Sequence, residues 1–285
     1  MTTLVAIGHV THDYYGSRVE AGGSAFYAAQ VWRHLGARAR VVTTIGTDFS
    51  APEAFEGLDV CSLREGETTA FRNLYHGDMR TQSIKAVAPA VDVSAFPRHW
   101  GAPDVLFLCP VFGEVDLADW VQQPAKTLAI GLQGWVKCAD PDDLERLKRV
   151  IRCSFNPSDE ALRAVDVAFC SDEDLAGQDG LFDRLRANVA CLVLTHGVSG
   201  CEVFCEGEHF RVGIYPARQL DPTGAGDSFA AGFLFARSRS ETWRDAARFG
   251  AAVASVVVEA EAGAALPSVS DAHERFHDIR VETRT

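Results

Sequence analysis

The stretch from Asp221 to Phe233 reads Asp-Pro-Thr-Gly-Ala-Gly-Asp-Ser-Phe-Ala-Ala-Gly-Phe. Pro222 can neither continue a helix nor donate to a sheet, and Gly224 and Gly226 allow bare backbone to approach a ligand closely. The apolar residues from Phe229 onward predict a buried helix whose N-terminus lies at these glycines. Free amides and the helix dipole at that end favour an anion such as phosphate.

Asp227 stands beside these amides. A carboxylate in that place is held ionised by hydrogen bonds and by the dipole, and it can accept a proton from an alcohol that attacks a nearby phosphorus atom. We therefore predict that Asp227 is a catalytic base and that Gly224, Ala225 and Gly226 form an anion hole. The alternative is that Asp227 only caps or charges the first turn of an apolar helix.

Composition limits the class of protein. With 285 residues, 47% hydrophobic and 23% charged, the chain can bury a large core and has an ordinary globular composition. The formal net charge of −12 argues against a nucleic-acid or membrane partner. We expect a cytoplasmic protein, because the N-terminus shows no charged leader and no apolar run approaches the ~18 residues of a membrane span. The eight cysteines include no Cys-x-x-Cys pair, so we expect buried thiols and no structural metal.

Short apolar runs alternate with helical stretches along the chain. The expected strands lie near residues 3–8, 39–45, 104–109, 126–132, 165–170 and 190–195. This alternation predicts an α/β fold over residues 1–285, with a mostly parallel sheet covered on both faces and with ligands at the carboxyl ends of the strands. The tail from Asp271 onward is predicted to be one helix and a frayed end.

Two segments interrupt the alternation. Residues 13–21 follow the first strand, and residues 68–88 read as two extended arms around His76-Gly77-Asp78, which has the chemistry of a hairpin turn. Together they predict a small sheet outside the main one. The alternative is a pair of surface hairpins with no role at a site.

The segment Asp221 to Phe233 resembles the C-terminal signature of the PfkB, or ribokinase-like, sugar and nucleoside kinases, a pattern of the type Asp-Thr-x-Gly-Ala-Gly-Asp. The pair Gly22-Gly23 before an apolar helix, and Ile45 to Asp48 after the next strand, resemble the first signature of the same family. The resemblance implies a three-layer α/β/α sandwich with a β lid formed by about residues 13–21 and 68–88. It also implies an ATP-dependent kinase that acts on a hydroxyl group, with a lid that pairs two subunits in a homodimer.

The acceptor side of the site follows from this resemblance. The family has an aspartate at the place of Asp13 that holds the sugar, and glycines like Gly22 and Gly23 against which the substrate lies. Without the resemblance, Asp13 reads as a loop carboxylate. Many sugar kinases of the family have an asparagine where this chain has Tyr27, which argues against a furanose such as ribose.

Two elements are similar to the inositol kinase branch of the family. One is the opening Gly8 to Asp13, and the other is Leu132-Gln133-Gly134-Trp135-Val136-Lys137. We therefore expect a cyclic polyol as the substrate, myo-inositol first, with Gln133 among its contacts. Lys137 could reach the transferred phosphate, or it could be a solvated loop lysine. The alternatives are a ribose, fructose or nucleoside kinase of the same family, and a catalytically silent sugar-binding regulatory member.

The donor side is indicated by Thr195 to Gly200, which follows an apolar strand. It resembles the family's Thr-x-Gly-x-x-Gly turn, which implies that Thr195, Gly197 and Gly200 lie at the nucleotide phosphates. Gly263 falls in the region that the family uses for adenine. The same residues also read as a strand followed by a hairpin turn.

Phosphoryl transfer from ATP needs a divalent cation, usually Mg²⁺. The family has an Asn-x-x-Glu element where this chain has Ser171 to Asp174, so the resemblance implies Mg²⁺ near Asp174. The alternative is an acidic helix start stabilised by its dipole. Asp221 and Thr223 match positions that bind a monovalent cation such as K⁺ in some members. Neither a P-loop motif nor a dinucleotide-binding motif is present.

Overall fold

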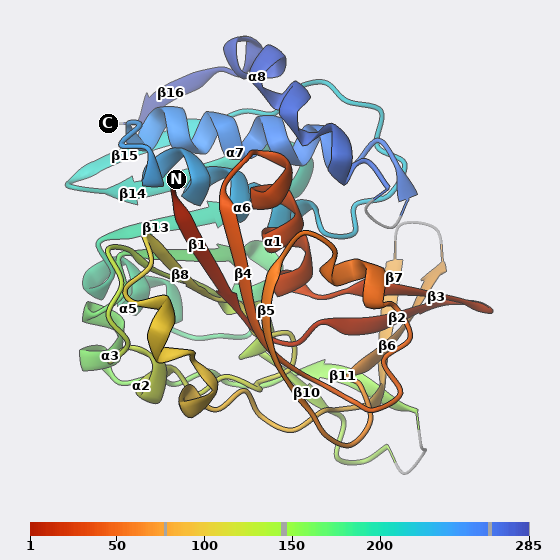
Figure 1. Ribbon diagram of the computed structural model, residues 1–285. Helices are drawn as coiled ribbons and strands as arrows, with labels where there is room; N and C mark the ends of the chain where they lie inside the picture. Colours follow the sequence, from red (N-terminus) through yellow and green to blue (C-terminus); the bar gives the residue numbers. More distant parts are fainter. Residues whose placement is uncertain (77–78, 144–146, 262–263, 285) are drawn as a thin grey trace.

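The computed structural model describes residues 1–76, 79–143, 147–261 and 264–284. Its largest element is a ten-stranded sheet in the order β16-β15-β14-β13-β12-β9-β8-β1-β4-β5 (Figure 1). The strands are β1 (Thr3–Ile7), β4 (Arg38–Ile45), β5 (Asp59–Arg64), β8 (Val105–Leu108), β9 (Leu128–Gly131), β12 (Val167–Ser171), β13 (Cys191–Thr195), β14 (Cys201–Cys205), β15 (Glu208–Val212) and β16 (Val281–Arg284). Neighbours from β5 to β13 are parallel and those from β13 to β16 antiparallel, so the prediction of a mostly parallel sheet is confirmed.

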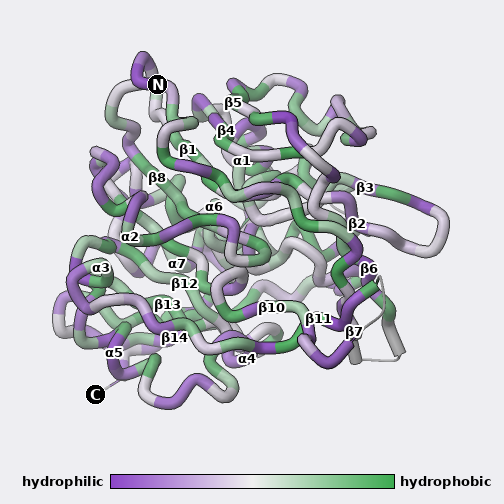
Figure 2. Tube along the Cα trace, turned by 90° about the horizontal axis from the view of Figure 1, so that it is seen from below, coloured by the Kyte–Doolittle hydropathy of each residue, from purple (hydrophilic) through white to green (hydrophobic). Residues whose placement is uncertain are grey.

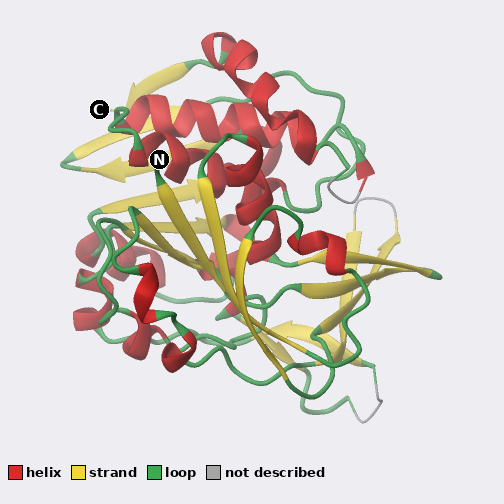
Figure 3. Cartoon of the chain, viewed as in Figure 1, coloured by secondary structure: helices red, strands yellow, loops and turns green. Residues whose placement is uncertain are grey.

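Helices cover both faces of this sheet, because alternate strand residues are buried on opposite sides. On β1, Leu4 and Ala6 join one apolar cluster, and Val5 and Ile7 join the other. One face packs against α1 (Ser24–His34), α6 (Ala225–Ser238), α7 (Trp243–Val257) and α8 (Ala272–Arg275), and the other against α2 (Leu117–Trp120), α3 (Asp159–Arg163) and α5 (Leu181–Asn188). Figure 3 shows these helices in red on the two sides of the yellow strands.

The remaining helical elements are short. They are α4 (Asp172–Leu175) and the 3-10 helices η1 (Pro52–Phe55), η2 (Val93–Ala95), η3 (Arg98–Trp100), η4 (Leu132–Gly134), η5 (Gly197–Ser199), η7 (Leu266–Asp271) and η8 (Phe276–Asp278). Among the described residues, no helix has both the length and the hydropathy needed to cross a bilayer.

A second sheet of six strands has the order β10-β11-β7-β6-β2-β3, and Figure 2 shows these strands gathered along one side of the molecule. They are β2 (Thr11–Tyr15), β3 (Arg18–Gly22), β6 (Ala70–His76), β7 (Met79–Ala86), β10 (Lys137–Ala139) and β11 (Lys148–Arg152). The first four are the extra sheet that the sequence predicts, although residues 77–78 of the expected hairpin lie outside the described residues. The strands β10 and β11 were not predicted, because their lysines and arginines leave no clear apolar alternation.

The prediction of a frayed C-terminal end was wrong. The helix α8 has four residues, and β16 then pairs with β15, with Val281 opposite Val212. Most of β16 is exposed, so its sequence shows no period of two. The strand forms because β15 offers an open edge to pair with, and that edge exists only in the folded chain.

Close packing fixes the position of α6, the helix that carries the signature segment. A Cβ atom on Gly232 would lie 2.8 Å from a methyl carbon of Val253, so α6 and α7 touch where only glycine fits. The indole nitrogen of Trp32 on α1 donates to the carbonyl oxygen of Ala231 at 2.9 Å. The middle of α6 is therefore held against both neighbouring helices, and this fixes where its N-terminus lies.

Candidate active site

A cleft lies between the N-terminus of α6 and the second sheet. Its lining residues are Thr11, Asp13, Gly23, Ser24, Tyr27, Phe71, Gln82, Val111, Gln133, Lys137, Thr223, Gly224 and Asp227. The cleft thus brings together five residues predicted from distant parts of the sequence, namely Asp13, Gly23, Gln133, Gly224 and Asp227. A second hollow, at the other end of α6 around Phe235 and Phe249, contains none of the predicted residues.

The start of α6 has the geometry that the sequence predicts, with one difference. Gly224 precedes the helix with φ +76°, and Asp227 lies in the first turn. The Ala225 amide, however, donates to the carbonyl oxygen of Pro222 at 3.1 Å. Ala225 can serve in the anion hole only if this turn bond is shared or broken. Gly226 does not line the cleft, and an added Cβ there would meet nothing within 4 Å.

Asp13 lies on β2 and is 7% exposed. Its Oδ1 accepts a hydrogen bond from the Thr11 hydroxyl at 2.9 Å. A Cβ on Gly22 would lie 2.5 Å from Asp13 Oδ2, and one on Gly23 would lie 2.4 Å from the carbonyl oxygen of His9. Both positions therefore require glycine, because a side chain on Gly22 would clash with Asp13 and one on Gly23 would clash with the backbone of His9. Gly23 also lines the cleft, whereas Gly22 acts by leaving room for Asp13.

Tyr27, which stands where many sugar kinases of the family have an asparagine, lines the cleft. Its ring atoms would lie 2.3 Å from a Cβ on Gly224, so the ring fills the space that this glycine leaves. Burial raises the pKa of the Tyr27 hydroxyl well above its ordinary value, and the nearby carboxylates of Asp13 and Asp227 raise it further. Tyr27 therefore keeps its proton at neutral pH.

Several lining residues were missed by sequence reasoning: Thr11, Ser24, Phe71, Gln82 and Val111. Phe71 and Gln82 lie on β6 and β7, the two predicted arms of the second sheet. A signal for them existed, because strand residues two apart share a face. The sequence does not tell which face of β6 and β7 lines the cleft, because that depends on how the two sheets are placed relative to each other.

The predicted donor residues form a turn outside this set of lining residues. Thr195 ends β13, where its hydroxyl donates to the carbonyl oxygen of Cys170 at 3.3 Å. Gly197 has φ +54°, and Gly200 has φ +87° with Val212 O only 2.1 Å from where a Cβ would lie. Thr195 is the register partner of Ser171, so the turn lies at the carboxyl edge of the parallel strands. Gly263 lies outside the described residues.

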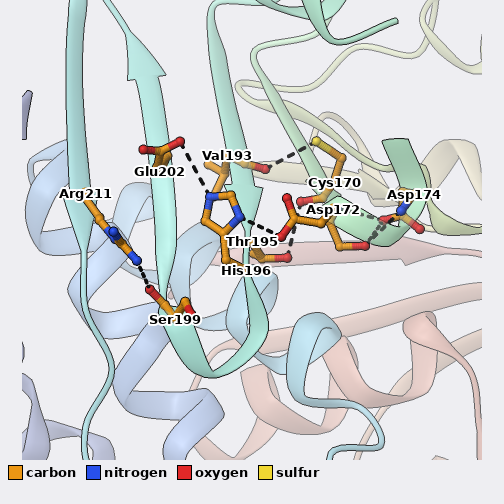
Figure 4. Close-up of polar contacts among 10 residues, drawn as sticks. Cys170, Asp172, Asp174, Val193, Thr195, His196, Ser199, Glu202 and Arg211 are labelled. Atoms are coloured by element: carbon orange, nitrogen blue, oxygen red, sulfur yellow. Dashed lines mark hydrogen bonds and ion pairs between the residues drawn. The ribbon is translucent and has the colours of Figure 1, made fainter. Parts of the chain in front are cut away.

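Figure 4 shows that His196 lies between two carboxylates in this turn. Its Nδ1 is 2.7 Å from Asp172 Oδ2, and its Nε2 is 3.6 Å from Glu202 Oε2. The Arg211 guanidinium donates to the carbonyl oxygen of Ser199 at 2.9 Å. These contacts tie the turn to α4, β14 and β15.

Asp174 caps a helix. Its Oδ2 accepts from both the amide and the hydroxyl of Ser171, at 2.9 and 2.8 Å, and the hydroxyl accepts from the Asp174 amide. The acidic helix start is thus a capping box, and the role of Asp174 toward Mg²⁺ stays a prediction. Among the described residues, no three His, Cys, Asp or Glu side chains converge to hold a metal ion.

Comparison with known proteins agrees with this geometry. The profile of the pfkB family carbohydrate kinases matches residues 145–269. The inositol 3-kinase of Oryza sativa subsp. japonica is 29% identical over 290 residues, covering 89% of this chain and 68% of the relative. A nucleoside kinase of Methanothermobacter thermautotrophicus is 26% identical over 320 residues, covering 96% of this chain and 95% of the relative. A solved pyrophosphate-dependent kinase of the ribokinase family, complexed with a pyrophosphate analog and myo-inositol, has a TM-score of 0.74 at 21% identity, covering 89% of this chain and 94% of that one.

The layers and the mostly parallel sheet define a ribokinase-like α/β fold. Residues 145–269 match the PfkB family of carbohydrate kinases, and together with the relatives this match indicates an enzyme that phosphorylates a hydroxyl group of a sugar or polyol. The predicted resemblance, the fold class and the kind of enzyme are therefore confirmed. Because the relatives include both inositol and nucleoside kinases, the particular acceptor is treated below as a proposal.

Proposed function

We propose that Asp227 is the catalytic base of this kinase and that the acceptor alcohol lies between Asp227 and Asp13. The observation that carries the proposal is that these two carboxylates, 214 positions apart in the sequence, line one cleft beside the N-terminus of α6. The acceptor hydroxyl loses its proton to Asp227 as its oxygen bonds to the terminal phosphorus of the donor. The bond from that phosphorus to the bridging oxygen breaks, and the shorter phosphate leaves.

The main-chain amides at the start of α6 would stabilise the charge that develops on the transferred group. Lys137 lines the same cleft and adds a positive charge on the side of the second sheet. The family implies a donor with a phosphoanhydride bond and a divalent cation, which neutralises charge between the donor phosphates when bound. We propose ATP at the turn from Thr195 to Gly200, and Mg²⁺ held mainly by donor oxygens and water.

The acceptor that we favour is a cyclic polyol, with myo-inositol first. The carboxylate of Asp13 and the amides of Gln82 and Gln133 line the cleft and suit neighbouring hydroxyl groups, which both donate and accept. The similarity to a plant inositol 3-kinase supports the same choice. A nucleoside is the second candidate, because the aromatic rings of Tyr27 and Phe71 also line the cleft and could stack on a base.

The second sheet is proposed to be a lid over the cleft that keeps water from the transferred phosphoryl group. Val19 and Leu74, each 38% exposed, lie on this sheet and would suit the predicted lid-to-lid homodimer. A K⁺ site at Asp221 and Thr223 also stays a prediction. Activity in potassium salts compared with sodium salts would test it.

The test of the proposed function is a matrix of donors and acceptors with the purified chain. ATP and pyrophosphate are each combined with myo-inositol, ribose, fructose, adenosine and cytidine, and the phosphorylated product is measured directly. We expect turnover with ATP and the highest kcat/KM with myo-inositol. If a nucleoside turns over faster than myo-inositol, the proposed acceptor is wrong and the nucleoside takes its place. If turnover with pyrophosphate is faster than with ATP, the proposed donor is wrong. No product from any pair would contradict the proposal.

A further inference from the structure

Glu114, in the loop between β8 and α2, is a buried acid that the proposed mechanism does not use. It is 4% exposed, and its carboxylate accepts three main-chain hydrogen bonds. The donors are the amides of His9 at 2.8 Å, Val111 at 2.9 Å and Phe112 at 2.8 Å. One side chain thus ties the segment after β1 to the loop after β8.

Two residues of the loop after β8, Val111 and Phe112, donate to Glu114. Both pack against the second sheet, and Val111 also lines the cleft. Val111 lines the cleft and forms an apolar cluster with Phe71 of β6 and Ile84 of β7. Phe112 packs against the same cluster, with its ring centroid 6.0 Å from that of Phe71 and the planes at 69°. Since Phe71 also lines the cleft, the loop supports the second sheet where that sheet faces the acceptor.

His9 connects the same acid to the two places where the chain enters and leaves the second sheet. Its Nε2 is 2.9 Å from the carbonyl oxygen of Pro89, which follows β7, and its Nδ1 is 2.7 Å from the hydroxyl of Thr69, which precedes β6. A carbonyl oxygen only accepts, so Nε2 donates to Pro89, and in the neutral ring Nδ1 accepts from the Thr69 hydroxyl. The Thr69 hydroxyl accepts in turn from the Ala88 amide at 2.9 Å.

We propose that Glu114 is a positioning residue that sets the second sheet over the cleft and thereby sets the affinity for the acceptor. It acts through Val111 on one side and through His9 on the other. This inference rests on the proposed function, because it assumes that the acceptor lies in the cleft. The donor turn from Thr195 to Gly200 has no described contact with this network.

The first test is Glu114→Gln in the full chain. In the variant, the glutamine NH₂ group must face at least one of the main-chain N–H groups that donate to the wild-type carboxylate. Two donors repel each other, so the loop shifts although the side chain keeps its size. With the best donor and acceptor of the matrix above, we expect the KM for the acceptor to rise ~10-fold, with the KM for the donor changed less than about twofold. The matched control is Asp116→Asn. Asp116 is a carboxylate of the same loop that does not line the cleft, and it accepts a hydrogen bond of 2.8 Å from the Ala118 amide.

The second test is Val111→Ala, which leaves Glu114 in place and applies even if Glu114→Gln does not fold. It should also raise the KM for the acceptor selectively. The double variant should lose less than the product of the two single effects, because both act through one contact. A role in stability alone would lower the melting temperature of both variants and leave both KM values unchanged, which would overturn the inference.

Failure of this inference can be distinguished from failure of the proposed function. If Asp227→Asn abolishes turnover while Glu114→Gln and Val111→Ala bind the acceptor as the wild type does, the kinase mechanism stands and the positioning role is wrong. If Asp227→Asn turns over like the wild type, the proposed mechanism is wrong and the inference about Glu114 falls with it.

Discussion

The two sheets of this molecule differ in how they are held. The ten-stranded sheet is buried on both faces, and its central strands are almost wholly apolar. The six-stranded sheet is held against the rest by a small cluster around Phe71, Ile84 and Val111, and its strands carry many polar side chains. The first sheet positions the helix that carries Asp227, whereas the second carries Asp13, Gln82 and Lys137. With the roles proposed for Asp227 and Asp13, the first sheet would carry the catalytic base and the second would carry most of the contacts that recognise the acceptor.

The largest effect should come from the helix packed on the rigid sheet. Asp227→Asn removes the proposed base, so we expect kcat to fall at least ~10²-fold with an unchanged melting temperature. The matched control is Asp245→Asn, because Asp245 has the same place in the first turn of α7 and lies outside the cleft. Steady-state kinetics measure both, and equal losses of kcat in the two variants would contradict the assignment.

Gly224→Ala should be the most destabilising change at the start of α6. The backbone there has φ +76° and the ring of Tyr27 occupies the place of a Cβ, so we expect a loss of about 1–3 kcal/mol in the free energy of unfolding. Gly226→Ala is the control, since nothing lies within 4 Å of its added Cβ. We expect its stability to be unchanged or higher by up to ~1 kcal/mol. Denaturant unfolding measures both, and equal stability of the two variants would contradict the packing argument.

Asp13→Asn tests the contribution of the second sheet. The amide keeps one acceptor oxygen, so we expect the KM for the acceptor to rise ~10-fold, about 1.4 kcal/mol of binding, with little change in the KM for the donor. Thr11→Val is a useful companion, because it removes the hydroxyl that donates to Asp13 Oδ1 and leaves the charge. A fall in kcat with both KM values unchanged would mean that Asp13 serves the chemistry and not recognition.

The smallest effect concerns His12, which stacks on Phe49 and accepts from the Ser50 amide at 3.1 Å. Burial lowers the pKa of His12 below 6.5, opposed by Asp48 and reinforced by Lys85. The unfolded chain therefore binds this proton first, and the stability that His12 contributes is lost as the pH falls below 6.5. The unfolding free energy of the wild type should fall more between pH 7.5 and pH 5.5 than that of His12→Gln. The expected difference between the two decreases is below about 1 kcal/mol. Identical losses in both proteins would contradict the role of burial.

The site could be predicted where it depends on neighbours in the sequence. The glycine turn before α6, the acid in its first turn and the glycine pair before α1 are local features with a fixed stereochemical cause. The resemblance to a known family then predicted Asp13 and Gln133 as acceptor contacts, and both line the cleft. Asp174 shows the limit of this reasoning, because a capping box and a metal ligand use the same short acidic pattern, and only the folded chain shows the capping contacts with Ser171.

By itself, the sequence determined the alternation of strands and helices, the start of α6 and the kind of chemistry at that start, because these follow from periodicity and from local backbone geometry. The tertiary structure alone decided that β10, β11 and β16 are strands, that Tyr27 fills the space over Gly224, and that Glu114 joins the ends of β1 and β8. Each of these depends on groups far apart in the chain. Hydrogen-bonding edges and close contacts between such groups exist only after the sheets have formed.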